Sequence, residues 1–188
     1  PDGLSRLAPL VARATDVGIK CLAMTDQGGR YGAIDVYKIA KSAGIKPIIG
    51  CKMYVAPKSR HERNPNEKAP YHMTVLAKSN RGYQNLIKLV TMSHLEGFYY
   101  RPRVDREILE QYSEDLIIMS GCPSGEVPSL ITQGRMDEAL EHYNRALDIH
   151  REVGNRRFEG IVLGNLGNLH MDKGRMEEAL EHYNQALA

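Results

Sequence analysis

The chain has 188 residues, of which 42% are hydrophobic and 26% charged, proportions that are typical of a globular protein and exclude a disordered one. Its formal net charge of +2 is too small to indicate nucleic-acid binding by itself. Three cysteines without CxxC spacing argue against a disulfide framework and favour a cytoplasmic location. No apolar run reaches the ~18 residues of a membrane span, so we expect no membrane partner.

The charge is distributed unevenly along the chain. Residues 1–133 carry 18 Lys and Arg against 13 Asp and Glu, whereas residues 134–188 carry 7 against 10. A basic first part and an acidic second part predict two domains, 1–133 and 134–188. Because the sequence begins Pro1-Asp2-Gly3 without a methionine, we also expect it to be a fragment.

Short apolar segments alternate with helical patterns through the first 133 residues. We expect helices over 4–14, 31–43 and 82–95, and strands over 21–25, 46–56 (one bent strand or two), 73–77 and 116–119. This alternation predicts a mainly parallel α/β sheet or barrel. The active site of such a fold lies where the carboxyl ends of strands meet loops. That edge would carry Asp26, Gln27, Lys52 and Cys122.

Two polar segments are interpreted as loops. Residues 57–70 are polar and bounded by prolines, so we expect an exposed loop, in which 58–63 is solvated. Residues 98–103, FYYRPR, interleave aromatic and basic side chains, and we expect a loop that packs its aromatic rings on the domain. The alternative function of both segments is contact with nucleic acid, by stacking on bases at 98–103 and by binding phosphates at 58–63.

Several long blocks of the first part match one known family. They include DGLSRLAPLV at 2–11, AMTDQGGRYGA at 23–33, AGIKPIIGCKMYVAP at 43–57, YHMTVLAKSNRGYQNLIKLV at 71–90 and SGCPSGEVPSLI at 120–131. In these blocks the chain resembles the polymerase-and-histidinol-phosphatase (PHP) domain of the bacterial DNA polymerase III alpha subunit. The resemblance implies an incomplete distorted β/α barrel. It also implies a cleft for several divalent ions, Zn, Mn or Mg, whose chemistry is phosphoester hydrolysis by metal-bound water.

The resemblance assigns metal ligands residue by residue. The family's ligand positions match Asp2, His72 and Cys122. The family's histidine after the second strand is replaced by Gln27, and its glutamate by Lys52, whose ammonium group would repel a cation. The family's HxH motif would precede residue 1. We therefore expect the chain to be catalytically inactive, with no catalytic residue and no bound metal.

Ordinary structural roles for the same residues stay open. His72 could be a half-buried histidine of a sheet, and Cys122 a small buried hydrophobic residue. Asp2 could simply be solvated near the end of the chain. Asp26 could hold the turn at Gly28-Gly29.

The second part contains an internal repeat. GRMDEALEHYNRAL at 134–147 recurs as GRMEEALEHYNQAL at 174–187, so the period is 40 residues and 12 of the 14 positions are identical. This part resembles the tetratricopeptide repeat, with three helices beginning near Met136, Phe158 and Met176. Glycines at 160, 164 and 167 would let the helices pack closely. The resemblance implies a protein or peptide partner.

The segment at 133–139, QGRMDEA, suits both resemblances, so we interpret it as a seam between a partial PHP domain and a partial repeat array. Two function classes follow. One is the replicative role and phosphoester chemistry of the polymerase family, with DNA as a partner through resemblance only. The other is a non-catalytic protein-interaction module. Unpaired strand edges and an uncapped helical array also predict self-association.

Overall fold

The computed structural model describes residues 6–65, 70–120 and 122–187. The chain divides into two compact units, 1–125 and 126–188, which are described separately below. Within the described residues, no helix is long and apolar enough to cross a membrane. Asp2, one of the three predicted ligands, lies outside the described residues.

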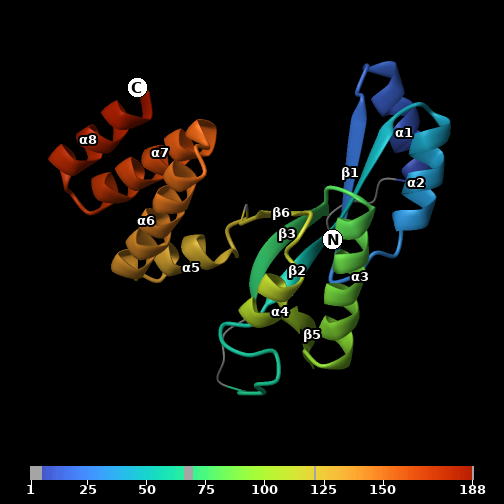
Figure 1. Ribbon diagram of the computed structural model, residues 1–188, viewed down its shortest axis with the longest axis horizontal. Coiled ribbons are helices and arrows are strands. Elements are labelled where there is room, and N and C mark those ends of the chain that lie inside the picture. The colour runs from blue at the N-terminus through green and yellow to red at the C-terminus, as the bar shows by residue number, and fades with distance from the viewer. Residues whose placement is uncertain (1–5, 66–69, 121, 188) are drawn as a thin grey trace. The chain divides into compact units, whose positions relative to one another are not determined.

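The first unit combines a sheet with four helices among its described residues (Figure 1). Its elements are α1 (Leu7–Asp16), β1 (Cys21–Gln27), α2 (Ala33–Ser42), β2 (Lys46–Val55), β3 (Tyr71–Ala77), α3 (Asn80–Leu95), β4 (Phe98–Tyr99), β5 (Arg101–Val104), α4 (Arg106–Gln111) and β6 (Leu116–Met119). The α/β fold class is therefore confirmed, and residues 46–55 form one strand rather than two. The prediction of a loop at 98–103 was wrong. The chain turns back there through Tyr100, at a positive φ of 57°, and forms a short antiparallel hairpin.

The sheet is mixed, which corrects the prediction of a mainly parallel one. β2 pairs in parallel with β1 and β5, whereas the β2–β3, β3–β6 and β4–β5 pairs are antiparallel. The reason is the connection between β2 and β3. The described residues between these strands, 56–65 and 70, form no helix, and a crossover helix is what normally returns the chain for parallel pairing. Apolar periodicity does not report strand direction, so the sequence could not reveal it.

One face of the sheet is covered by helices and forms the main core. Cys51, Met53 and Val55 alternate along β2 and pack with Val75, Val104 and the buried leucines of α3. Figure 1 shows α3 running along this sheet. A second, smaller cluster joins α1 to α2 through Val11, Ala14, Ala40 and Ile45.

In the first turn of α3, Gly82 packs closely against the backbone of Asp115. Ser79 caps the helix, since its hydroxyl accepts a hydrogen bond from the Gly82 N–H at 3.2 Å. A Cβ at Gly82 would lie 2.0 Å from the Asp115 carbonyl oxygen. Only glycine fits there, and this contact brings the segment before β6 against α3.

The second unit consists of α5 (Glu126–Thr132), α6 (Met136–Glu152), α7 (Arg156–Asp172) and α8 (Met176–Leu187). Two apolar clusters hold it together, one built around Leu147, Val162, Leu163 and Leu166, the other around Leu130, Ala139 and Leu169. Gly167 permits close packing, because a Cβ there would lie 2.5 Å from the Tyr183 ring. The three predicted repeat helices are present, and α5 precedes them.

Candidate functional site

A group of polar side chains lies on the face of the sheet opposite the main core. Lys52 and Tyr54 alternate along β2 with the buried Cys51 and Met53, so they occupy the other face. The strand register places Gln27 of β1 beside Lys52 and His72 of β3 beside Tyr54. Three strands therefore bring to one place the residues that the resemblance aligned with a metal cleft.

Tyr54 is the centre of this polar group. Its hydroxyl donates a hydrogen bond to Gln27 Oε1 at 3.0 Å and accepts one from Arg101 Nη1 at 3.1 Å. The His72 ring meets the Tyr54 ring edge to face, with centroids 5.2 Å apart. Tyr54 itself is only 5% exposed. Gln27 is thus engaged by a protein hydroxyl at the position where the family would have a histidine ligand.

His72 and Cys122 lie next to each other, although 50 positions separate them in the sequence. The Cys122 Sγ is 3.5 Å from His72 Nδ1. The backbone N–H of His72 donates to the Ser124 carbonyl at 2.9 Å, which ties the turn after β6 to the start of β3. Two of the three predicted ligand positions are therefore neighbours. His72 is half-buried in a strand, as the ordinary structural interpretation also expects.

Asp26 and Cys51 do not join this group. Asp26 Oδ2 accepts a hydrogen bond from the Gly32 N–H at 3.0 Å and so holds the turn that leads into α2. Burial raises the pKa of the Cys51 thiol to about 11. That thiol stays protonated at neutral pH, whereas metal ligation and nucleophilic attack require the thiolate.

The described residues do not fit the multi-metal centre that the resemblance implies. Protein zinc sites use three or four His, Cys, Asp or Glu ligands, and the described part of the chain contains no group of three that could hold a metal ion. His72 and Cys122 supply two donors. The Lys52 side chain adds a positive charge on the same face.

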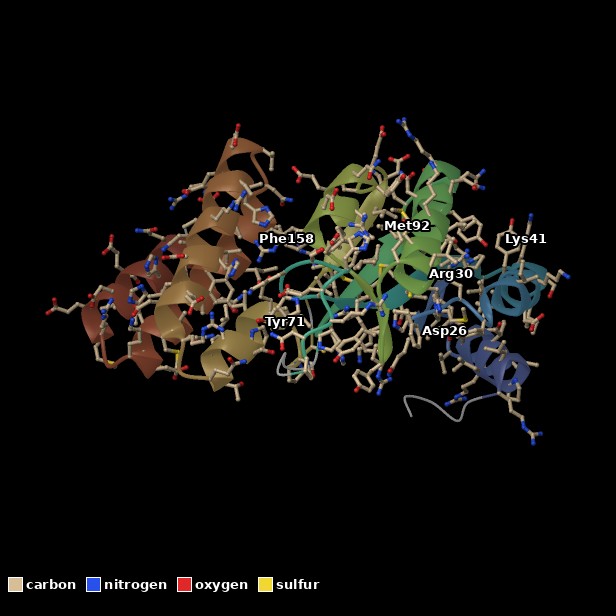
Figure 2. The ribbon with its side chains drawn as sticks, turned by 90° about the horizontal axis from the view of Figure 1, so that it is seen from below. Asp26, Arg30, Lys41, Tyr71, Met92 and Phe158 are labelled. Carbon is tan, nitrogen blue, oxygen red and sulfur yellow. The ribbon has the colours of Figure 1, made fainter. Side chains whose placement is uncertain are left out.

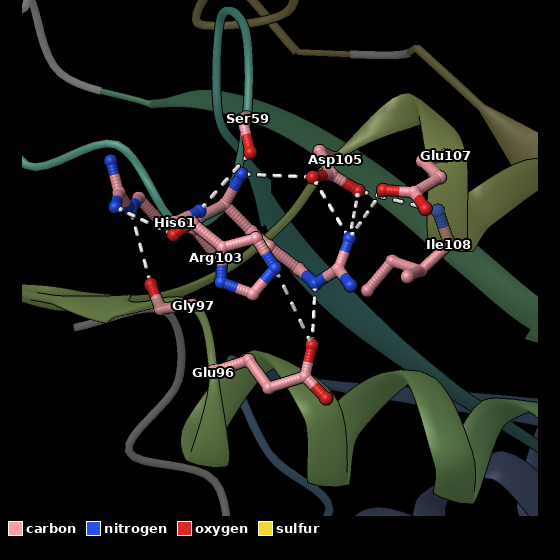
Figure 3. Close-up of polar contacts among 9 residues, drawn as sticks. Ser59, His61, Glu96, Gly97, Arg103, Asp105, Glu107 and Ile108 are labelled. Atoms are coloured by element: carbon pink, nitrogen blue, oxygen red, sulfur yellow. Dashed lines mark hydrogen bonds and ion pairs between the residues drawn. The ribbon is translucent and has the colours of Figure 1, made fainter.

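A second polar cluster was missed by sequence reasoning (Figure 3). Figure 3 labels three carboxylate residues of this cluster, Glu96, Asp105 and Glu107. Arg60, in the segment expected to be solvated, is only 7% exposed. Its guanidinium donates to Glu96 at 2.7 Å, to Glu107 at 3.0 Å and to Asp105 at 3.1 Å, and its backbone N–H donates to Asp105 at 2.8 Å. The prediction of a solvated 58–63 segment was therefore wrong at Arg60. The composition of the loop gave no signal, because the partners lie 36–47 positions further along the chain.

Asp105 organises this second cluster. Burial acts to raise the pKa of its carboxyl, but hydrogen bonds from the backbone N–H groups of Arg60 and Ile108 and the charge of the Arg60 guanidinium together hold the pKa below its usual 3.8. Asp105 is also the N-cap of α4, since its carboxylate accepts from the Ile108 N–H at 3.2 Å. The ionised carboxylate thereby joins the 57–65 loop to α4. The cluster therefore has a structural role. Its hydrogen-bonded side chains, Arg60, Glu96, Asp105 and Glu107, are different from those of the group around Tyr54.

Comparisons with known protein families match two overlapping parts of the chain. The sequence model of the PHP domain matches residues 1–156, and that of the tetratricopeptide repeat matches residues 129–188. The chain therefore belongs to the PHP domain family, and the predicted resemblance is confirmed. Both models match residues 129–156, the region that contains the predicted seam, so the boundary between 133 and 134 stays a prediction.

The similar curated proteins are replication proteins. The chain is 47% identical to the DNA polymerase III subunit alpha of Treponema pallidum over 143 residues, 75% of this chain and 12% of that protein. It is 45% identical to that of Borreliella burgdorferi over 156 residues, 82% of this chain and 13% of that protein. It is 43% identical to that of Thermus aquaticus over 162 residues, 84% of this chain and 13% of that protein. The chain thus spans about an eighth of the length of these relatives.

Proposed function

We propose that the chain supplies a PHP domain to a replication protein of the DNA polymerase III alpha type, and that the domain acts there as a non-catalytic structural part. The replicative role rests on the likeness to the alpha subunits. The observation that supports the non-catalytic role is the hydrogen bond from Tyr54 to Gln27, with Lys52 beside it. At these two positions an amide and an ammonium group replace the imidazole and carboxylate ligands that hold divalent ions.

The proposal is tested by titrating the purified chain with Mn²⁺ and Zn²⁺ in a calorimeter and by assaying hydrolysis of p-nitrophenyl phosphate. We expect fewer than two ions per chain and no metal-dependent hydrolysis. Stoichiometric binding of two or more ions together with metal-dependent hydrolysis, both lost in His72→Ala and Cys122→Ala, would overturn the non-catalytic role and establish His72 and Cys122 as ligands of a working site.

A restoring variant makes this test sharper. Gln27→His combined with Lys52→Glu returns the family's two ligand types, and we expect it to bind Mn²⁺ more tightly than the original chain by about tenfold or more. Gln27→His combined with Lys52→Gln removes the positive charge without adding a carboxylate. If this control gains as much affinity, the new imidazole and the loss of the positive charge account for the gain, and a carboxylate at position 52 is not a ligand.

A second candidate function is supported by the helical unit. Leu147 of α6 is 5% exposed, because α7 covers it, whereas the equivalent Leu187 of α8 is 87% exposed. Leu180 is 61% exposed, while its equivalent Leu140 packs in both apolar clusters. We propose that this face of α8 binds an apolar helix of the α7 type, supplied by a protein partner.

A synthetic peptide with the sequence of residues 155–173 tests this second function, because it reproduces α7. We expect saturable binding to the full chain in fluorescence anisotropy, weakened about tenfold or more by Leu187→Asp, which places a charge in the contact. A peptide carrying Leu163→Asp and Leu166→Asp is the matched control. Equal binding of both peptides, or binding that Leu187→Asp leaves unchanged, would exclude the proposed face.

A further inference from the structure

A cavity of about 650 Å³ lies in the first unit, away from the group around Tyr54. Side chains of α2, the first half of β2, the end of β3 and the start of α3 line it. Along β2, the lining residues Pro47 and Ile49 have the same parity as the buried Cys51 and Met53, whereas Lys46 and Ile48 have that of Lys52 and Tyr54, so the cavity lies at the first half of β2 and takes residues of both parities. Its volume falls within the 300–1,000 Å³ typical of small-molecule sites.

The charges around the cavity all have one sign. Lys38, Lys46 and Lys78 line it from three different elements, and none of the lining residues is an aspartate or glutamate. All three lysines are exposed. Because no lining carboxylate offsets these charges, the cavity favours an anion.

The rest of the lining is apolar and aromatic. Ile34 and Tyr37 of α2 are 60% and 47% exposed, and Tyr83 of α3 contributes a second ring from a different helix. Each ring has a further cation near it. Lys41 Nζ lies 5.3 Å from the Tyr37 centroid, and the Arg30 guanidinium lies 5.4 Å from that of Tyr83. Arg30 and Lys41 are labelled in Figure 2.

We propose that this cavity binds a mononucleotide. The flat base would lie on the isoleucine and tyrosine surface, because every base has a π face that can stack on an aromatic ring, and the phosphates would meet the lysines. A purely apolar ligand would form no ion pair with the three lysine ammonium groups, and inorganic phosphate would make no contact with the apolar surface. A nucleotide uses both. The site is separate from the metal chemistry considered above, since its lining includes none of the residues Gln27, Lys52, Tyr54, His72 and Cys122.

The test is calorimetric titration of the full chain with ADP in the presence of EDTA, with adenosine and inorganic phosphate as separate probes. We expect ADP to bind at least tenfold more tightly than either. Lys38→Glu with Lys46→Glu should weaken ADP binding at least tenfold. Tyr37→Ala should weaken it about fivefold or more, while Tyr37→Phe keeps the ring and should bind within twofold of the original chain.

The matched control is Lys58→Glu with Lys88→Glu, which makes the same change in net charge at exposed lysines that do not line the cavity. We expect this control to bind ADP within twofold of the original chain. Equal weakening by both double variants would show nonspecific attraction and overturn the proposal. Equal affinity for ADP and adenosine, or no ADP binding, would overturn it as well. Circular dichroism of each variant verifies that it is folded.

Discussion

Arg60→Ala should lower the free energy of unfolding of the first unit by about 3–5 kcal/mol, because removing one partner of a buried ion pair leaves the other charge uncompensated. Asp105 is 2% exposed and would keep only its backbone hydrogen bonds. The 57–65 loop would lose its attachment to α3 and α4, which runs through Glu96, Asp105 and Glu107. Most of the loss should come from Asp105, since the Glu107 side chain is 77% exposed and well solvated.

Urea unfolding of the full chain, followed by circular dichroism and by hydrogen exchange of α3 and α4, measures this loss. Arg81→Ala is the matched control. Arg81 also forms an ion pair, with Glu114, but their side chains are 65% and 58% exposed. Surface pairs of this kind contribute about 0–1 kcal/mol. If the two variants differ by less than about 1 kcal/mol, Arg60 is not the buried anchor that the contacts indicate.

The elements that sequence reasoning predicted correctly are those whose pattern is local. Gly18 and Gly44 both take positive φ, at 75° and 73°, just after α1 and α2, as is typical of glycines that end helices. The repeated GRM-EALEHYN segments begin α6 and α8 as expected. Arg60 and the short hairpin at 98–104 were predicted wrongly, because their structure depends on partners far along the chain. The polar composition of a loop cannot distinguish a solvated arginine from one that is paired with three carboxylates.

The candidate site was predictable only in part for the same reason. Resemblance pointed to His72 and Cys122, and the structure places them in contact. It also pointed to Gln27 and Lys52 as departures from the family. Tyr54 and Arg101 were not predicted, although they complete the hydrogen bonds at Gln27. The available signal was period two in β2, which puts residue 54 on the same face as residue 52. Arg101 reaches Tyr54 because β5 pairs with β2, and no local pattern in the sequence predicts which strands pair.

The internal repeat permits a comparison of one residue type at two equivalent positions. Leu147→Ala should lower the free energy of unfolding of the helical unit by about 2–5 kcal/mol, because it removes buried methyl groups and leaves a cavity beside Val162, Leu163 and Leu166. Leu187→Ala should change it by less than about 0.5 kcal/mol, since that side chain is already 87% exposed. The local sequences are almost identical, although Leu147 lies inside α6 and Leu187 is the last residue of α8.

Hydrogen exchange of the α7 amides in the full chain measures both variants in the same segment. We expect α7 to exchange faster in Leu147→Ala and to remain unchanged in Leu187→Ala. If α7 exchanges equally faster in both variants, Leu187 makes stabilising contacts in solution although its side chain is exposed in the structure. The exposed face of α8 would then already be covered. The same outcome would remove the free surface on which binding of an α7-type helix depends, so this pair of variants decides whether the helical unit can serve as an interaction module.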